Sequence, residues 1–419
     1  MATVTAPSLP ATPARREGRS QAMPTPFHVK AATAAVLILW VLIAAFPLFW
    51  ILVMSFKLPV DAFSSDPLDV VLGPSTREAG EGLSLIDVLG GLLVLVVGYN
   101  LVASRAAGWA RRLAFGGSGA LGWLVVVLLV AAGGFLAVAV LVPAGFALAE
   151  AAASRIPGLG WLAEPVLGAT GRHYWAVWIR NGFYRNFQNS LMITAGVVTV
   201  SLTVGTLAGY ALARTKSSLA FWLLITALIF RALPHSVLVT GYLPPFINSR
   251  ELLQPLWDAP VLGWVLHLFS GAPPTLYGQP WAVIAVLVAI NQPFTIWMLR
   301  SFFQNVPAEL DEAARVDGCT HFEAFRRVIM PVMWPGVITT GLFSFLLAYN
   351  DYLVCALLLD AQSQTMVPAI TQYFNRETTA TDQIEAVAAA VSITAPLFVL
   401  VMVFQRQIVS GLTAGAVKG

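Results

Sequence analysis

Residues 31–56 read AATAAVLILWVLIAAFPLFWILVMSF, an apolar run without a single charged side chain. A helix needs about 20 apolar residues to cross the hydrocarbon core of a bilayer, because its backbone groups must be satisfied within the segment. The rest of the chain has the same character: of 419 residues 58% are hydrophobic and 11% are charged, and the mean hydropathy is +0.76. This composition excludes an ordinary water-soluble enzyme and predicts an all-α, polytopic membrane protein.

The apolar residues gather into eight runs that are each long enough to cross a bilayer. The predicted spans lie at about residues 31–56, 83–102, 120–149, 189–213, 219–243, 281–300, 337–359 and 386–404. Another apolar stretch, residues 252–268, contains Pro255 and Pro260, which interrupt a helix. We expect this stretch to form a short interfacial helix and not a ninth span.

The basic residues predict the orientation of the spans, because Lys and Arg collect in cytoplasmic segments. With both termini inside, the cytoplasmic segments hold Arg15, Arg16, Arg19, Lys30, Arg105, Arg111, Arg112, Arg214, Lys216, Arg300, Arg315, Arg326, Arg327, Arg406 and Lys418. Residues 1–27 are rich in Pro, Ala, Thr and Ser and are expected to form a disordered cytoplasmic tail. Residues 28–58 contain the first span, which is expected to remain as an anchor.

One polar segment between the predicted spans has enough local signals to form a folded element. Residues 305–331 read NVPAELDEAARVDGCTHFEAFRRVIMP. Pro307 is expected at the first position of a helix and Gly318 at its end, where glycine tolerates a left-handed backbone. A Thr-x-x-Glu capping box at Thr320 starts a second helix, which Pro331 is expected to end. The segment is therefore predicted to be two short helices outside the membrane, here called the 305–331 loop.

Each predicted helix of this loop has an apolar face at helical spacing. The positions are Leu310, Ala313 and Ala314 on the first helix, and Phe322, Phe325 and Ile329 on the second. A helix pair of this kind could dock in a groove of a cytoplasmic partner. An amphipathic hairpin that lies against the bilayer would show the same pattern.

The loop resembles the EAA signature of bacterial ABC importer permeases, with Glu312, Ala313, Ala314, Asp317, Gly318, Ile329 and Pro331 as the matching residues. Cys319 stands where that signature usually has Ala, and Met330 where it usually has Leu. Further motifs resemble the carbohydrate-uptake permeases, and most closely the second permease subunit of maltose-type systems. These motifs lie at residues 46–50, 55–57, 189–191, 210–214, 293–300, 349–353 and 404–419. The resemblance covers about residues 31–58 and 174–419.

The resemblance implies a six-span permease with the type I ABC importer fold. Such a subunit pairs with a second homologous permease, sits on two ATP-binding subunits and receives a sugar or oligosaccharide from an extracytoplasmic sugar-binding protein. It would be a multi-pass transporter subunit of the bacterial inner membrane and not an enzyme. ATP and Mg would be bound by the partner ATPase subunits, and this chain would hold no cofactor or metal.

The resemblance also implies that residues 305–335 are the loop that couples this subunit to the ATPase, with Glu312 at the contact and Gly318 at the turn. The coupling residues carried over are Glu312, Ala313, Ala314, Asp317, Gly318, Phe322, Phe325, Ile329 and Pro331. A rigid element with one charge at its tip would transmit a rigid-body movement, whereas a flexible loop would absorb it.

Two parts of the chain depart from the family pattern. Residues 59–173 separate the first span from the permease domain, residues 174–419, and hold two of the eight predicted spans. Because two spans preserve the topology, we expect a six-span core with an inserted hairpin, which either adds lipid-facing area or contacts an extra subunit or the binding protein. The long outer segment at residues 244–279 would be a lid, a docking surface or a cap over the outer mouth.

Polar side chains inside the predicted spans are candidates for the substrate path, because such groups are expensive in lipid and tend to face a cavity. The candidates are Arg231, Asn291, Gln292, Asn350, Asp351 and Tyr352. Snorkelling or a pair with Asp351 would explain Arg231 as well, and helix packing or an outer gate would explain Asn350 and Asp351. Gly205 and Gly209 form a GxxxG pair, which predicts close packing of two helices.

Other functions find less support in the sequence. A formal net charge of +3 gives no reason to expect nucleic acid as a partner, and the scattered His residues give none to expect a metal site. The chain has no Gly-x-x-x-x-Gly-Lys-Ser/Thr loop and so cannot hydrolyse ATP by that route. A membrane-embedded enzyme such as a glycosyltransferase would need clustered acids or a nucleophile and base, which the sequence does not show. The same importer class with a polyol or a glycerol phosphate derivative as cargo stays open.

Overall fold

The computed structural model describes residues 26–94, 96–98, 100, 142–215, 217–233, 235–260, 262–269, 273–374 and 379–416. The predicted tail up to residue 25 and the predicted third span up to residue 141 lie outside the described residues. Outside them too are several of the basic residues that predict the orientation, namely Arg15, Arg16, Arg19, Arg105, Arg111, Arg112, Lys216 and Lys418. The chain divides into two compact units, Met1–Trp50 and Ile51–Gly419.

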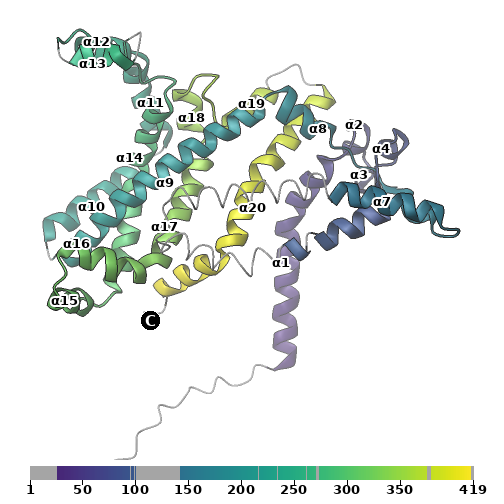
Figure 1. Cartoon of the computed structure of the whole chain (residues 1–419), viewed down its shortest axis with the longest axis horizontal. Coiled ribbons are helices and arrows are strands. Elements are labelled where there is room, and N and C mark those ends of the chain that lie inside the picture. Colours follow the sequence, from purple (N-terminus) through teal and green to yellow (C-terminus); the bar gives the residue numbers. More distant parts are fainter. Residues whose placement is uncertain are drawn as a thin grey trace, which may run out of the picture. The chain divides into compact units, whose positions relative to one another are not determined.

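Five helices among the described residues are long and apolar enough to cross a membrane (Figure 1). Four of them are α1 (Phe27–Met54), α9 (Phe183–Arg214), α14 (Pro280–Gln304) and α20 (Ala380–Ala416). The fifth runs without a break through α16 (His321–Ala324), η4 (Phe325–Ile329) and α17 (Met330–Tyr349). The predicted all-α, polytopic membrane bundle is confirmed.

The predicted span at residues 219–243 is wrong as a single helix. The structure has two shorter helices there, α10 (Ser218–Arg231) and α11 (His235–Ile247). At the end of α10 the amide of Ala232 bonds to the carbonyls of Leu228 and Ile229, which tightens the last turn. The sequence places Pro234 directly after this turn, and because proline has no N–H it cannot continue the hydrogen-bond ladder.

The boundaries predicted for the span at residues 337–359 are wrong, because the observed helix lies earlier in the sequence. Its helix begins earlier and ends at Tyr349, and the short helix α18 (Leu353–Leu358) follows. The Asp351 carboxylate accepts a hydrogen bond from the Cys355 amide at 3.1 Å, which satisfies an amide at the start of α18. A local capping signal therefore divides an apolar run that is continuous in sequence.

Shorter helices occupy the remaining polar segments. The predicted interfacial helix at residues 252–268 is two helices, α12 (Ser249–Trp257) and α13 (Leu262–Phe269). Another short helix, α19 (Met366–Phe374), lies between α18 and α20. The predicted second span begins as a strand at Leu83–Ser84 and becomes helical over Leu85–Gly98. The predicted third span ends in α7 (Val142–Arg155), which extends beyond the expected boundary at residue 149.

The centre of the larger unit is formed by α9, α14 and α17, which pack along one another (Figure 1). Two glycines of α9 allow the close approach of α14. A Cβ on Gly205 would stand 2.6 Å from Thr295 Cγ2. A Cβ on Gly209 would stand 3.1 Å from the backbone nitrogen of Arg300. Because a larger side chain would push the helices apart, the predicted close packing at this GxxxG pair is confirmed.

A small folded region follows α1 and is here called the platform, residues 55–84 and 165–173. It contains α2 (Pro59–Ala62), α3 (Pro67–Leu72), α4 (Pro74–Glu78), β1 (Leu83–Ser84) and β2 (Pro165–Leu167). The short helix α8 (Arg172–Trp175) and the π-helical turn η3 (Ala176–Arg180) follow β2 in the chain. The strands pair antiparallel, with Leu83 opposite Leu167. The 3₁₀ turn η2 (Gly160–Ala163) precedes β2. The pairing brings together the two ends of residues 85–164, the middle part of the inserted segment 59–173.

A buried lysine joins the two halves of the platform. Lys57 is only 1% exposed, and its Nζ donates hydrogen bonds to the carbonyls of Val71, at 2.8 Å, and Gly168. Burial lowers the pKa of the Lys57 ammonium, and the nearby Asp61 carboxylate opposes that shift. The platform is therefore held by contacts between residues that lie more than a hundred positions apart in the sequence.

A buried carboxylate fixes α2 against α4 in the same region. Asp61 is 2% exposed and accepts hydrogen bonds from the Ser75 amide and from the amide and hydroxyl of Thr76, at 3.1, 2.6 and 2.6 Å. Burial raises the pKa of Asp61, but these hydrogen bonds outweigh burial and hold it below its ordinary value. The buried ring of His173 bonds to the Lys57 carbonyl at 3.1 Å and closes the platform from the other side.

Candidate functional site

The 305–331 loop folds as two helical segments joined by a glycine turn. The first helix is α15 (Glu309–Val316), and Gly318 follows it with a φ of +87°. The Thr320 side chain accepts from the Glu323 amide while the Glu323 carboxylate accepts from the Thr320 amide. The predicted glycine turn and capping box are confirmed. These local hydrogen bonds fix the turn between the two helical segments.

Both predicted proline positions are wrong. Pro307 precedes α15 by two residues, because the helix begins at Glu309. Pro331 does not end the second helix: it is the second residue of α17 and lies inside a continuous helix. The π-helical turn η4 lies directly before it and already departs from the ordinary i→i−4 ladder. The loop therefore continues without interruption into a membrane span.

The base of the loop is buried in the core of its own chain. Phe325 is 8% exposed, Ile329 is fully buried, and both pack in one cluster with Leu299, Phe303 and Val337. This cluster joins the inner ends of α14 and α17 to the second helical segment. Two of the three residues of the larger predicted apolar face thus hold the loop in place, and only Phe322, at 63% exposed, is presented outward.

The tip of the loop carries most of the predicted coupling residues. Four of them are exposed, namely Glu312, Ala313, Asp317 and Gly318, whereas Ala314 is the buried residue of α15. Val316 is 87% exposed, which makes it an apolar side chain with little contact to its own chain. A shallow polar notch of about 630 Å³ opens here, lined by Glu312, Arg315, Val316, Gly318, Cys319, Thr320 and His321. The tip therefore offers both charge and an apolar contact.

Three further residues of the site were missed as a group by sequence reasoning. Arg214 Nη2 lies 2.7 Å from Asp311 Oδ2, and the Tyr210 hydroxyl donates to Asp311 Oδ1 at 2.5 Å. Tyr210 and Arg214 belong to one of the motifs that resemble carbohydrate permeases, and this resemblance is the only feature of the sequence that points to them. Their partner stands about a hundred residues later, so spacing along the chain could not reveal the contact.

Arg231 lies half-buried in the last turn of α10, beside the interruption of that span. Its guanidinium carbon is 4.8 Å from the centroid of the Phe294 ring on α14, and its Nε has no hydrogen-bond partner among the described residues. A cation is favoured at this position because the last turn of a helix presents unpaired carbonyls.

Two neighbouring amides of α14 take different positions. Asn291 is fully buried, and its Nδ2 donates to the Ser344 hydroxyl of α17 at 2.8 Å. Gln292 is half-buried, and its Nε2 donates to the Ser201 carbonyl of α9 at 3.4 Å. The side-chain oxygens of both amides are buried and have no partner in the described part of the chain. A buried acceptor without a donor is a place where water or a polar ligand can bind.

The three remaining path candidates lie together after α17. Asn350 is exposed and donates to the Leu346 carbonyl at 3.0 Å, which caps the helix. Asp351 caps α18, and the neighbouring Tyr352 is 45% exposed. The structure therefore places these residues at the boundary between α17 and α18.

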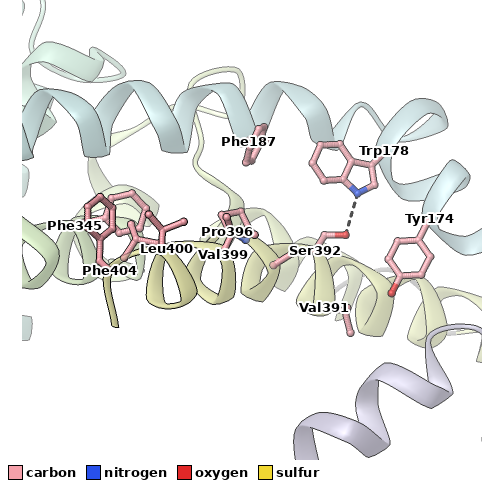
Figure 2. Close-up of a pocket in the computed structure, with 12 residues that line it drawn as sticks. Tyr174, Trp178, Phe187, Phe345, Val391, Ser392, Pro396, Val399, Leu400 and Phe404 are labelled. Carbon is pink, nitrogen blue, oxygen red and sulfur yellow. Dashed lines mark hydrogen bonds between the residues drawn. The ribbon is translucent and has the colours of Figure 1, made fainter. Parts of the chain in front are cut away.

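An apolar groove of about 700 Å³ lies between α20 and the start of α9 (Figure 2). Its aromatic lining includes Tyr174, Trp178 and Phe187, and Phe345 comes from α17. The Trp178 indole nitrogen donates to the Ser392 hydroxyl at 2.9 Å, as Figure 2 shows. The groove suits an apolar occupant and not a hydroxyl-rich solute.

Comparison with known proteins gives a family match and close relatives. The family described as "Binding-protein-dependent transport system inner membrane component" matches residues 201–413. The diacetylchitobiose uptake system permease protein DasC of Streptomyces coelicolor is 34% identical over 252 residues, which are 60% of this chain and 81% of that protein. The trehalose transport system permease protein SugB of Mycobacterium tuberculosis is 30% identical over 245 residues, 57% of this chain and 80% of that protein.

A solved structure of a bacterial ABC transporter involved in the import of the acidic polysaccharide alginate is also similar. It has a TM-score of 0.43 and 17% sequence identity, and the match covers 69% of this chain and 98% of that chain.

Proposed function

The chain belongs to the family of binding-protein-dependent transport system inner membrane components, and from this premise we propose that it is the permease subunit of an ATP-driven importer for a sugar or oligosaccharide. Membership makes it a multi-pass protein of the inner membrane. The names of DasC and SugB, which refer to diacetylchitobiose and trehalose, support a carbohydrate as the cargo.

The proposed assembly contains a second homologous permease subunit, two ATP-binding subunits and an extracytoplasmic sugar-binding protein. ATP and Mg bind to the ATP-binding subunits in this assembly, and our chain supplies the path and the mechanical contact. The chain has no Gly-x-x-x-x-Gly-Lys-Ser/Thr loop of its own, so energy must come from a partner.

The observation that carries this proposal is the division of the 305–331 loop into a buried base and an exposed tip. Phe325 and Ile329 pack with the inner ends of two spans, while Glu312 and Val316 extend away from them. Movement of the tip is therefore passed to the spans through packed side chains and continuous helix. A loop without a buried base would bend under the same force.

We assign the substrate path to the polar atoms that lack partners inside the bundle. Arg231 and Gln292 are half-buried, and each has a buried polar atom without a partner in the described residues. Hydroxyl-rich solutes provide both donors and acceptors, which these buried polar atoms lack among the described residues. Asn291 is fully buried and holds α14 against α17 in this proposal.

The experiment uses the complex purified from its native membrane through an affinity tag on this chain and reconstituted in liposomes. Glu312→Ala removes the charge at the tip without touching the buried base. We expect uptake to fall by about a hundredfold, because a contact between subunits that involves a charge is worth about 2–3 kcal/mol. Glu251→Ala is the matched control, since Glu251 is also an exposed acid but lies on α12.

Normal uptake by Glu312→Ala at normal abundance would show that the loop does not couple the subunit to an ATPase. Purified complex without any ATP-binding subunit would refute the wider proposal. Stimulation of ATP hydrolysis by a panel of mono- and oligosaccharides identifies the cargo, and a response to polyols alone would replace sugar by that class.

A further inference from the structure

The inner end of α9 is tied to the 305–331 loop by one guanidinium. Arg214, the last residue of α9, donates from Nε to Asp311 Oδ2 at 2.8 Å, and its Nη2 lies 2.7 Å from the same oxygen. Its Nη1 donates to the carbonyls of Phe303, at 3.3 Å, and Val306, at 3.1 Å. A single side chain thus joins α9 to α15 and to the segment that leads from α14 into the loop.

A tyrosine one turn earlier on α9 binds the other oxygen of the same carboxylate. The Tyr210 hydroxyl donates to Asp311 Oδ1 at 2.5 Å. The Tyr210 ring packs against Phe303 and Phe325, with centroids 5.5 and 4.9 Å away. Both oxygens of Asp311 are therefore bound by α9, and the contact continues into the buried base of the loop.

The burial of this contact distinguishes it from an ordinary surface ion pair. The Arg214 and Asp311 side chains are 22% and 15% exposed, so water screens the pair only in part. Charge-assisted hydrogen bonds of this kind are about twice as strong as neutral ones, and the planar guanidinium fixes their direction. The pair can therefore resist both separation and rotation of α15.

The position of Asp311 on α15 determines which way the tip faces. Successive residues of a helix point about 100° apart, so fixing Asp311 against α9 turns its neighbour Glu312 away from α9. α15 has only eight residues and lies between Pro307 and Gly318, and a helix of that length is not stable alone. Its orientation must come from contacts outside the helix.

We propose that Tyr210, Arg214 and Asp311 form a joint that orients α15 and passes its movement directly to α9. The inference rests on the proposed function of the 305–331 loop. It adds a direct contact between α15 and α9 to the connection along the chain into α14 and α17. Since α9 packs closely against α14 at Gly205 and Gly209, a displacement of α9 moves the packed centre of the bundle. The three residues are positioning residues that act through the tip.

The test measures uptake and ATP hydrolysis in the same liposomes that hold the purified complex. Asp311→Asn keeps the size of the side chain and removes its charge. We expect transported substrate per ATP hydrolysed to fall about tenfold, with basal ATP hydrolysis and subunit composition unchanged. Glu309→Gln is the matched control, because Glu309 is an exposed acid in the first turn of the same helix.

Two further variants separate a joint from a merely structural role. Tyr210→Phe keeps the ring against Phe303 and Phe325 and removes only the hydroxyl, and we expect about a threefold fall in substrate per ATP. The double variant of Asp311→Asn with Arg214→Gln should lose no more than Arg214→Gln alone, because both act through one contact. Tyr210→Phe also remains informative if a charge variant fails to assemble.

Wild-type coupling in both Asp311→Asn and Tyr210→Phe would overturn the joint, and so would additive losses in the double variant. These results differ from failure of the proposed function, in which the wild-type complex itself lacks ATP-binding subunits or substrate-stimulated hydrolysis. A working wild-type complex with unaffected variants would therefore refute the joint alone.

Discussion

The platform and the tip of the 305–331 loop are both polar regions outside the long helices, yet they are stabilised in different ways. The platform buries its charges: Lys57 and Asp61 are 1% and 2% exposed. Lys57 joins segments from both sides of residues 85–164, and Asp61 holds α2 against α4. The tip of the loop keeps Glu312, Val316 and Asp317 exposed, and a glycine turn and a capping box fix its turn. The platform is therefore held by buried charges, whereas the charges at the tip of the loop stay available for the proposed contact with a partner.

Loss of the buried lysine should give the largest difference in local stability between the platform and the 305–331 loop. Lys57→Met leaves the Val71 and Gly168 carbonyls without their charged donor, and we expect the platform to lose about 3 kcal/mol of local stability. Amide exchange of Gly168 and Thr170, which bond to Leu72 and Phe56, should quicken about a hundredfold. Exchange in the 305–331 loop should not change. Lys30→Met is the control, since Lys30 is exposed, and equal effects of the two variants would refute the role of Lys57.

Alanine in place of one glycine from each region tests the turn. Gly318 has a φ of +87° and no atom within 4 Å of an added Cβ, so Gly318→Ala should cost about 1 to 2 kcal/mol through the backbone alone. Uptake should fall several-fold as the loop loses its shape. Gly171 in the platform has equal space but a φ of −93°, and Gly171→Ala should be tolerated. Similar uptake by both variants would mean that the turn geometry is unimportant.

Removal of a helix cap should have a smaller effect. Thr320→Ala abolishes the capping box of α16 and should cost about 1 kcal/mol, seen as faster exchange of the Glu323 amide. Asp66→Ala removes the corresponding cap of α3, where the Asp66 side chain accepts from the Leu68 amide. We expect the platform variant to change less, because Lys57 and Asp61 hold that region from outside α3. A larger effect of Asp66→Ala would contradict this division between local and long-range stabilisation.

The smallest expected effect is a dependence of the platform on pH. Burial lowers the pKa of His173 below its ordinary value of 6.5, although its hydrogen bond to Lys57 opposes the shift. The unfolded segment therefore takes up a proton before the folded platform does, and platform stability should fall as the pH drops below about 6.5. Exchange rates corrected for intrinsic chemistry would show this loss, and His173→Gln should reduce it. A platform that becomes more stable toward pH 5 would contradict the assignment.

The comparison also explains which features were predictable from the sequence. The turn at Gly318 and the cap at Thr320 depend on neighbours within a few residues, so their signals lie in one short stretch. The platform and the joint at Asp311 depend on pairs about a hundred residues apart, and no spacing rule points from one member to the other. The predicted helix end at Pro331 is wrong because a π turn accommodates this proline. The predicted boundary at residue 359 is wrong because hydropathy does not report where a new helix cap falls.

The most direct test of the central claim is site-specific photo-cross-linking in intact native membranes. A photoreactive residue at position 316, where Val316 is 87% exposed, should give an adduct with an ATP-binding subunit. The same residue at position 68 of the platform, where Leu68 is 66% exposed, should give none with that subunit. Adducts from both positions, or from position 68 alone, would contradict the assignment of the 305–331 loop as the contact with the ATPase.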